Sequence, residues 1–538
     1  MQNEMVNTVR EGGGASGARV AARASTLDVS AEELRALARL FDGLAREYMS
    51  EPEALPVFPE TSAERVSEIF KRELPAEPAG LEALARDCRE VLRHSRQNGH
   101  PRMFGYVASP AAPAGAYATL LASALNSNVT SWRSAPSATA VEKTVVRWLA
   151  EMIGYAGAGV NEDCGGLLTS GGSMANLNAL FVAHRSKARE FAKGGGARAD
   201  ARDPSRAGLW GSGAPTTLYA SDQIHLSIPK AADVLGLGRD NVRVVPSGPD
   251  FKIDVRALRE LVDADAARGL RPFCVVASAG TVSTGAVDPL GEVARVARER
   301  SLWFHVDGAY GALAASAQSR RALFEGIGEA DSVSLDPHKW LYTPLDCGCL
   351  LYREPARARE AFAGTEEGYI KVFEQTEEEA HAFWDYGVEL SRPFRALKVW
   401  AILSYYGARR VGASIEEDCA LAGYMAERVE ASEDLELLAP AALGICCFRY
   451  APASLRKELE KAKGDGDERE RLNARLDDLN ARVMRRVQRG GEAYVSNAVL
   501  RGRFALRASI TNFRTTRRDV DLTLDAVRRA AVELEGEN

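Results

Sequence analysis

The 538-residue chain lacks the features that mark several specialised classes of protein. Its eight cysteines are too few for a disulfide framework, and their closest pairs lack the spacing of zinc ligands. No apolar run approaches the roughly 18 residues of a membrane helix, and the N-terminus has no apolar signal-peptide core. Lys and Arg (68) nearly balance Asp and Glu (74), so no basic field would hold nucleic acid or an anionic membrane. We therefore expect a cytoplasmic protein without metal, nucleic-acid or membrane partners.

The composition is that of a globular protein, with 46% hydrophobic and 26% charged residues. Residues 1–28 are rich in Gly, Ala, Ser and Arg, and we expect a disordered tail there. Ser30-Ala-Glu-Glu33 is a capping box that opens a run of leucines at helical spacing, and a second amphipathic helix is predicted over 81–96. Because an amphipathic helix needs a partner for its apolar face, both helices are candidates for an intermolecular contact.

Between about residues 165 and 355, short apolar or β-branched runs alternate with helical segments. This alternation predicts an α/β fold with a mainly parallel sheet flanked by helices. Ligands of such sheets bind beyond the carboxyl ends of the strands, so reactive residues should follow the strands directly. The expected strands are Thr217–Ala220, Val242–Val245, Phe273–Ala279, Leu302–Val306, Ser332–Leu335 and Gly348–Tyr352.

Two charged residues follow expected strands in this way. Lys339 stands in Asp-Pro-His-Lys-Trp, where desolvation would favour the neutral amine that a Schiff-base nucleophile needs. Asp307 ends the run Trp-Phe-His-Val-Asp, and a buried acid there needs a partner such as a protonated pyridine nitrogen. Taken singly, Lys339 would more often be a surface lysine, and Asp307 is equally consistent with a helix N-cap.

Three further turns follow strands. Thr169-Ser-Gly-Gly-Ser opens a helix, where free N–H groups could cradle a phosphate. It matches neither the dinucleotide nor the P-loop glycine pattern, which disfavours both kinds of nucleotide site. His225 follows the strand that ends near Ala220 and could stack on a flat aromatic cofactor. Thr281 brings a hydroxyl group to a fourth strand end.

A phosphate cradle, a ring-stacking His, a Thr, an acid and a lysine are together the parts of a pyridoxal phosphate site. The sequence resembles the group II pyridoxal-phosphate-dependent amino acid decarboxylases, which include aromatic L-amino acid, glutamate and cysteine sulfinate decarboxylases. The motifs that carry the resemblance are Thr-Ser-Gly-Gly-Ser-x-Ala-Asn, Val-Asp-x-Ala-Tyr and Asp-Pro-His-Lys-Trp, in this order. It runs from about Ser30 to the C-terminus and leaves out the Gly-rich insert 193–215 and the charge-rich segment 454–490.

The resemblance implies a role for each matching residue. Lys339 would hold pyridoxal 5'-phosphate (PLP) as a Schiff base, Asp307 would pair with the pyridine nitrogen, and His225 would stack on the ring. The reaction would decarboxylate an L-amino acid to its amine and CO₂, through an external aldimine and a quinonoid. Tyr369, on a proposed lid over 361–385, would protonate the carbanion. The residues that would surround the phosphate or pack on the ring are Gly172, Ser173, Ser332, His338, Thr281 and Ala309.

The resemblance also implies the type I fold of PLP-dependent transferases and a homodimer with composite active sites. On this basis we divide the chain into four parts. They are a disordered tail (1–28), an N-terminal helical dimerisation segment (29–112), a large PLP-binding domain (113–410) and a small α+β C-terminal domain (411–538).

The substrate class is inferred from the segments that match the family's side-chain pocket. Tyr106 and Ser109 are candidate contacts there. Glutamate-type members carry Asn-Gln where this chain has Gly105-Tyr106, which favours an aromatic substrate. Trp132, supplied by the partner subunit, and Arg507 match further substrate positions. Arg133 beside Trp132 leaves an acidic substrate open.

Other functions remain open at this point. The same cofactor would serve decarboxylation of glutamate, aspartate or cysteine sulfinate, aromatic aldehyde synthesis, or aminotransfer. A non-catalytic relative that keeps only the fold is the remaining alternative.

Overall fold

The computed structural model describes residues 27–157, 159–193, 215–362, 376 and 378–537. Nearly all of the predicted tail 1–28, most of the insert 193–215, and Tyr369 with most of the predicted lid lie outside these residues. The chain divides into two compact units, residues 1–51 with 71–92 and residues 52–70 with 93–538. These units do not follow the four predicted parts, whose boundaries stay a prediction.

The first unit is helical where it is described. It contains α1 (Ala31–Ser50) and nearly all of α3 (Gly80–Arg93). The predicted capping box is present, because Ser30 Oγ accepts from Glu33 N at 3.2 Å and Glu33 Oε2 accepts from Ser30 N at 2.8 Å. Arg72 and Asp87 are joined by an ion pair, with Nη2 donating to Oδ1 at 2.8 Å.

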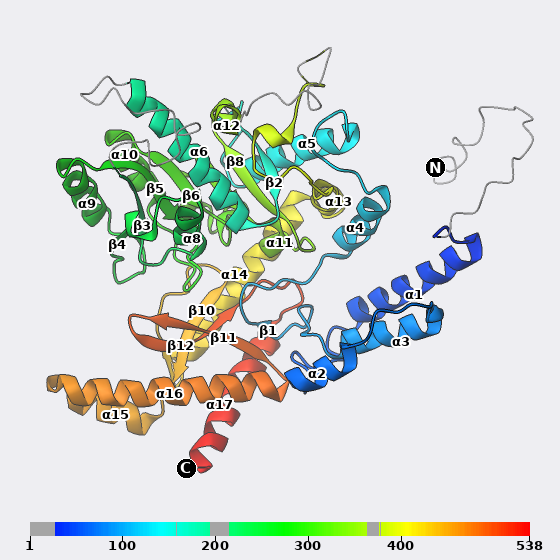
Figure 1. The fold of residues 1–538 in the computed structure, drawn as a ribbon. Coiled ribbons are helices and arrows are strands. Elements are labelled where there is room, and N and C mark those ends of the chain that lie inside the picture. The colour runs from blue at the N-terminus through cyan, green and yellow to red at the C-terminus, as the bar shows by residue number, and fades with distance from the viewer. Residues whose placement is uncertain (1–26, 158, 194–214, 363–375, 377, 538) are drawn as a thin grey trace, which may run out of the picture. The chain divides into compact units, whose positions relative to one another are not determined.

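The second unit contains, in its described residues, a seven-stranded sheet of order β2-β8-β7-β6-β5-β3-β4 (Figure 1). All neighbouring pairs from β7 through to β4 are parallel, while β8 is antiparallel to both β7 and β2. β2 therefore runs in the same direction as the parallel strands, and the predicted mainly parallel sheet is confirmed. The strands are β2 (Gly165–Thr169), β3 (Thr216–Ser221), β4 (Val242–Val245), β5 (Arg271–Ser278), β6 (Trp303–Asp307), β7 (Ser332–Leu335) and β8 (Gly348–Tyr352).

Helices flank this sheet (Figure 1). α6 packs along β5 to β8, whereas α9 and α10 pack against β5 and its neighbours. Strand side chains such as Val275, Val306 and Leu350 are fully buried between these layers, which explains why the strands read as continuous apolar runs. The helices of this part are α4 (Pro113–Leu125), α5 (Pro136–Met152), α6 (Gly172–Lys193), α8 (Ser227–Val234), α9 (Val255–Ala267), α10 (Leu290–Glu299), α11 (Pro337–Trp340), α12 (Pro355–Phe362) and α13 (Ala396–Tyr406).

A second sheet, of order β1-β11-β12-β10-β9, belongs to the C-terminal part, where the predicted strand and helix after Arg503 are both found. β1 (Met103–Phe104) comes from the segment predicted as N-terminal and pairs in parallel with β11. This pairing brings the predicted substrate segment around Tyr106 to the C-terminal sheet. The other elements are α2 (Ala63–Phe70), α14 (Ala408–Glu430), β9 (Leu435–Leu437), β10 (Ile445–Tyr450), α15 (Ala453–Lys461), α16 (Gly466–Gly490), β11 (Tyr494–Leu500), β12 (Arg503–Ser509) and α17 (Arg517–Gly536).

The charge-rich segment 454–490 lies largely within α15 and α16. One stripe of α16 is buried, including Leu476 and Val483, so the pair is part of the C-terminal core and not only a solvated face. None of the helices in the described residues is long and apolar enough to span a membrane.

Candidate active site

The predicted reactive residues meet at one edge of the seven-stranded sheet. Six of its strands run in one direction, so their carboxyl ends lie together. The turn that opens α6 follows β2, and His225 follows β3. Asp307 is the last residue of β6, and Lys339 lies in α11 directly after β7. The order of strands thus assembles residues that are far apart in the sequence.

Lys339 forms an ion pair at the base of this site. Its Nζ lies 2.9 Å from Asp336 Oδ2, and the Asp336 side chain is only 3% exposed. The other carboxylate oxygen of Asp336, Oδ1, is buried without a hydrogen-bond partner. Behind the lysine, Trp340 stacks on Tyr310 with ring centroids 4.7 Å apart. Lys339 is therefore next to a buried aromatic pair, and the Asp336 carboxylate orients its amine.

Asp307 is a buried carboxylate, and its hydrogen-bond donors among the described residues are all neutral. It is 6% exposed. Its Oδ2 accepts from Asn176 Nδ2 at 3.0 Å, and its Oδ1 accepts from Ala309 N at 3.2 Å and Ser334 Oγ at 3.3 Å. A buried carboxylate that has only neutral donors is stabilised further by a cation. A protonated pyridine nitrogen would supply that cation.

His225 is held by the first turn of α8. Its Nδ1 accepts from Ser227 N at 3.2 Å and lies 2.8 Å from Ser227 Oγ. Burial lowers the pKa of His225, the charge of Asp307 opposes this, and the charge of Lys339 adds to it. The imidazole is therefore neutral near pH 7, as a ring that stacks on a flat cofactor should be.

The glycine turn at the start of α6 has no space for a side chain, so its backbone approaches its neighbours closely. A Cβ on Gly172 would lie 2.6 Å from Ala309 Cβ and 3.1 Å from Asp336 Oδ2, and one on Gly171 would lie 3.3 Å from His338 Cε1. The turn also presents the N–H groups of the first helical turn, which bind phosphate well. A phosphate cradle, a neutral imidazole, a buried acid and a lysine together fit PLP.

The remaining predicted cofactor residues divide into two groups. Thr281 follows β5 and Ala309 follows the neighbouring strand β6. Ala309 contacts both Asp307 and the Gly172 position. Gly308 occupies the x of the Val-Asp-x-Ala-Tyr motif, and a Cβ there would lie 2.5 Å from Ala312 Cβ, which explains the glycine. His338 accepts from Cys347 N through Nδ1 at 3.1 Å and lies beside the cradle.

Ser332 is not brought to the cradle. It begins β7, at the end of the strand opposite to the one that Lys339 follows. Its Oγ accepts from Trp303 Nε1 at 2.9 Å and lies 2.9 Å from His305 Nδ1. At about 3.3 Å per residue, three residues of strand separate it from the carboxyl edge, so the structure places it behind the site.

The predicted substrate residues are placed as follows. Ser109 Oγ donates to His338 O at 2.9 Å, next to Lys339. Tyr106 is exposed, and its hydroxyl lies 3.4 Å from that of Tyr494. The structure joins Arg507 to Tyr106, because Arg507 Nη1 donates to Tyr106 O at 2.7 Å.

Arg507 connects backbone segments through its hydrogen bonds. It is 4% exposed, and its Nε donates to the carbonyl oxygens of Val282 (2.9 Å) and Ser283 (3.2 Å). The guanidinium therefore links the loop after β5 to the Tyr106 segment, while its Nη2 is buried without a hydrogen-bond partner among the described residues. Trp132 N donates to His381 O at 3.0 Å, and Arg133 beside it is exposed.

Three polar residues of this site were missed in the sequence. Asp336 stands in the lysine motif and Asn176 in the glycine motif, but neither was assigned a role. His305 is two residues before Asp307, so the period of a strand places both on one face. The His-x-Asp spacing could have revealed it, whereas only the structure shows that Asn176 lies between them.

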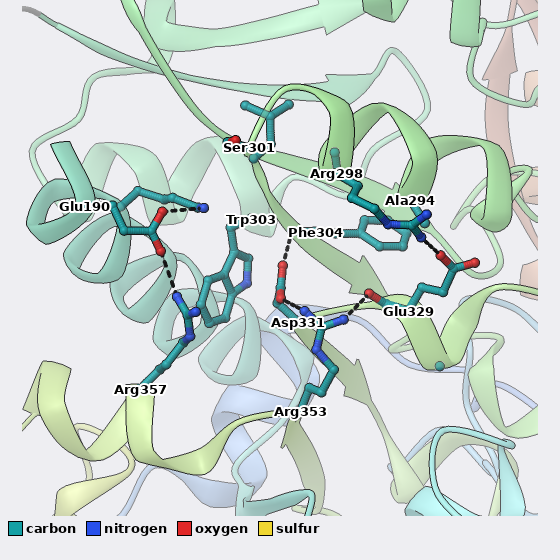
Figure 2. Close-up of a pocket in the computed structure, with 14 residues that line it drawn as sticks. Glu190, Ala294, Arg298, Ser301, Trp303, Phe304, Glu329, Asp331, Arg353 and Arg357 are labelled. Carbon is teal, nitrogen blue, oxygen red and sulfur yellow. Dashed lines mark hydrogen bonds and ion pairs between the residues drawn. The ribbon is translucent and has the colours of Figure 1, made fainter. Parts of the chain in front are cut away.

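A second polar pocket, of about 390 Å³, lies at the opposite edge of the sheet (Figure 2). We call it the amino-edge pocket, because Trp303 begins β6 and Asp331 directly precedes β7. Its charged side chains are paired with one another. Its charged lining residues are Lys187, Glu190, Arg298, Glu329, Asp331, Arg353 and Arg357.

Comparisons with known proteins agree with the site. Residues 63–451 match the family model described as the pyridoxal-dependent decarboxylase conserved domain. The aromatic-L-amino-acid decarboxylase of Bacillus atrophaeus is 31% identical over 509 residues, which cover 94% of this chain and 97% of the relative.

Two solved structures are similar along nearly the whole chain. The crystal structure of Oryza sativa TDC with PLP and tryptamine is 28% identical, covers 95% of this chain and 100% of that chain, and has a TM-score of 0.82. Mouse CSAD is 25% identical, covers 94% and 99%, and has a TM-score of 0.83. The chain is thus a PLP-dependent enzyme of the type I fold and belongs to the pyridoxal-dependent decarboxylase family.

Proposed function

We propose that this protein decarboxylates an aromatic L-amino acid to the corresponding amine and CO₂, with Lys339 as the residue that binds the cofactor aldehyde. The observation that carries the proposal is the meeting of Lys339, Asp307 and His225 at one sheet edge, beside the Gly172 turn. No single one of these residues would carry it, because each has an ordinary structural role elsewhere.

Each residue has a distinct task in this proposal. When bound, PLP draws the electron pair of the breaking Cα–carboxylate bond into its ring. Asp307 keeps a proton on the ring nitrogen, since that proton supplies the cation that its neutral donors lack. The helix N-terminus at Gly172 and Ser173 holds the phosphate. Neutral His225 offers its face to the ring, and Asp336 orients Lys339 Nζ.

The protonation step is assigned to Tyr369, which we propose as the proton donor to the substrate Cα. The placement of Thr281 and Ala309 at adjacent strand ends supports the proposal that they pack on the ring. His338 remains a proposed neighbour of the phosphate, while Ser332 takes no part in the cradle.

An aromatic substrate is favoured by what surrounds Tyr106. Tyr106 and Tyr494 lie 6.0 Å apart between ring centroids and leave an aromatic surface there. Arg507 Nε and Nη1 are occupied by main-chain carbonyl groups, so this arginine has only Nη2 left and does not offer the two-nitrogen fork that pairs best with an acidic side chain. The names of the relatives from Bacillus atrophaeus and Oryza sativa point to the same substrate class.

We further propose a homodimer in which a second copy covers the apolar face of α4 and α13. Leu120 and Leu121 of α4 and Tyr405 of α13 are 67%, 54% and 75% exposed. Neighbouring exposed apolar side chains of this size mark interaction surfaces, and Trp132 would reach the second active site from there. Exposed Leu34 and Phe41 of α1 support a further contact with the partner. The eight free cysteines are consistent with a cytoplasmic location, which we propose.

The test is an assay of the purified protein with PLP. We expect a visible absorption band, and release of CO₂ and amine from Phe, Tyr, Trp or DOPA but not from Glu, Asp or cysteine sulfinate. Release of CO₂ and amine from the acidic amino acids would change the proposed substrate class. Formation of aldehyde and ammonia would change the proposed reaction. The absence of both a band and turnover would contradict the proposal.

The dimer is tested separately by light scattering after size-exclusion chromatography. We expect twice the 58.1 kDa chain mass for the wild type. Leu121→Asp should shift the measured mass toward that of the monomer. A wild type with the mass of a single chain would contradict the dimer.

A further inference from the structure

A chain of buried polar residues lies directly behind Asp307. Asn176 is on the first turns of α6, four residues after Gly172, and is 1% exposed. Its Nδ2 donates to Asp307 Oδ2 at 3.0 Å, and its Oδ1 lies 3.0 Å from Nε2 of fully buried His305. Asn176 thus joins the phosphate-cradle helix to the strand that carries the acid.

The direction of each hydrogen bond in this chain is fixed by chemistry. A carboxylate only accepts, so Asn176 must present its amino group to Asp307 and its oxygen to His305. His305 must then carry its proton on Nε2, which leaves Nδ1 to accept from Ser332 Oγ at 2.9 Å. Burial lowers the pKa of His305 to about 4, so this imidazole is neutral near pH 7.

The second N–H of Asn176 serves another residue of the site. Nδ2 also donates to Ser227 Oγ at 2.9 Å, and Ser227 Oγ lies 2.8 Å from His225 Nδ1. Because the oxygen of Ser227 accepts from Asn176, its own hydrogen is available to His225. One amide group therefore fixes both the acid and the ring-stacking histidine.

We propose that Asn176 is a positioning residue that orients Asp307 and His225 together, with neutral His305 as its support. The inference rests on the proposed function, in which these two residues act on the cofactor. Loss of the amide would free both side chains at once, whereas a substitution in only one arm would free one of them.

Isosteric variants separate this role from simple packing. Asn176→Asp keeps the shape but loses both donors, and Asn176→Leu removes the polar group. His305→Gln keeps a donor toward Asn176 and an acceptor toward Ser332, while His305→Leu removes both. PLP affinity by equilibrium dialysis, the visible spectrum of the PLP-loaded protein, and thermal melting without PLP are measured for all four variants.

We expect Asn176→Asp and Asn176→Leu to weaken PLP binding about tenfold or more and to shift the visible band, because a hydrogen bond to a buried charge is lost. His305→Leu should change both readouts in the same direction, and His305→Gln should stay within about twofold of the wild type. If Asn176→Leu fails to fold, Asn176→Asp decides the question.

Two results would overturn the inference. One is a folded Asn176→Asp variant with wild-type affinity and spectrum. The other is a His305→Gln variant as impaired as His305→Leu, which would assign the effect to packing. A wild type that binds no PLP would overturn the proposed function itself, and the two failures are distinguished by that control.

Discussion

The two polar regions at opposite edges of the seven-stranded sheet use charge in contrasting ways. In the amino-edge pocket, Glu190 accepts from Lys187 Nζ at 2.7 Å and from Arg357 Nη1 at 2.9 Å, as Figure 2 shows. Asp331 pairs with Arg353 and accepts from Phe304 N at 2.8 Å. At the carboxyl edge, by contrast, the part of the chain that the structure describes gives Asp307 only neutral donors and leaves one buried oxygen of Asp336 without a partner.

The difference shows that density of charge alone does not mark an active site. The amino-edge pocket holds more charged groups, but they neutralise one another and the pocket is consistent with a structural role. The carboxyl edge holds fewer charges whose partners are incomplete, and this leaves them free to act on a bound molecule. Matched substitutions, one at each edge, test this contrast.

The largest effect is expected for Lys339→Ala. Removal of the amine proposed to bind the cofactor aldehyde should lower kcat about 10³-fold or more and abolish the visible Schiff-base band of the PLP-loaded protein. The matched change at the other edge is Arg357→Ala, whose side chain is 36% exposed. It should leave kcat within about twofold, and a loss of activity there would break the comparison.

The next effect is expected for Asp307→Asn. The amide has nearly the same shape but no charge for the ring nitrogen, and we expect kcat to fall about 100-fold. Asp331→Asn is its counterpart and should leave kcat unchanged while lowering the free energy of unfolding by about 1–3 kcal/mol. Steady-state assays and urea unfolding measure the two quantities. Equal kinetic effects of both variants would count against the contrast.

A smaller effect is expected when the cradle is filled. Gly172→Ala would place a Cβ 2.6 Å from Ala309 Cβ, so the turn or its neighbour must move. We expect the dissociation constant of PLP to rise about tenfold. Gly423→Ala, a helical glycine of α14 with open space around its Cβ position, is the control. Equilibrium dialysis with PLP should show wild-type affinity for it, and equal losses in both variants would contradict the cradle.

The smallest effect concerns the pH dependence of stability. Because the folded pKa of His305 is about 4, against an ordinary value near 6.5, only the unfolded chain takes up its proton in this range. This contribution is complete above about pH 6.5 and is lost as the pH falls toward 4. His305→Gln should therefore reduce the fall in unfolding free energy between pH 6.5 and pH 4, by about 1–3 kcal/mol in total.

The matched control for this measurement is Glu190→Gln. Burial acts to raise the pKa of Glu190, but hydrogen bonds from Lys187 and Arg357 bring it below its ordinary value. Its contribution is thus present above its unfolded pKa near 4.5 and is lost only below that pH. An unchanged slope in His305→Gln between pH 6.5 and 4 would refute the assignment.

The strands and most of the site could be predicted from the sequence. The predicted strands Ser332–Leu335 and Gly348–Tyr352 coincide with β7 and β8, which are buried throughout, and the run Cys349–Leu350–Leu351 shows the successive apolar residues of a strand covered on both faces. The rule that reactive groups follow strands singled out Lys339, Asp307 and His225, which the structure brings to one sheet edge, and their roles at the cofactor stay a prediction. That rule needs only local patterns and the parallel direction of the sheet.

What only the tertiary structure decided are the partners of those residues. Ser332 was expected at the phosphate, but it lies at the other end of its strand, since the motif spacing does not say how many residues the strand spans before the site. Asn176 and Asp307 are 131 residues apart in the chain and become neighbours only when α6 packs on the sheet. The sequence determined which groups reach the carboxyl edge, because strand and turn formation are local. Folding decided which of them are paired and which remain available, because hydrogen-bond partners come from distant segments.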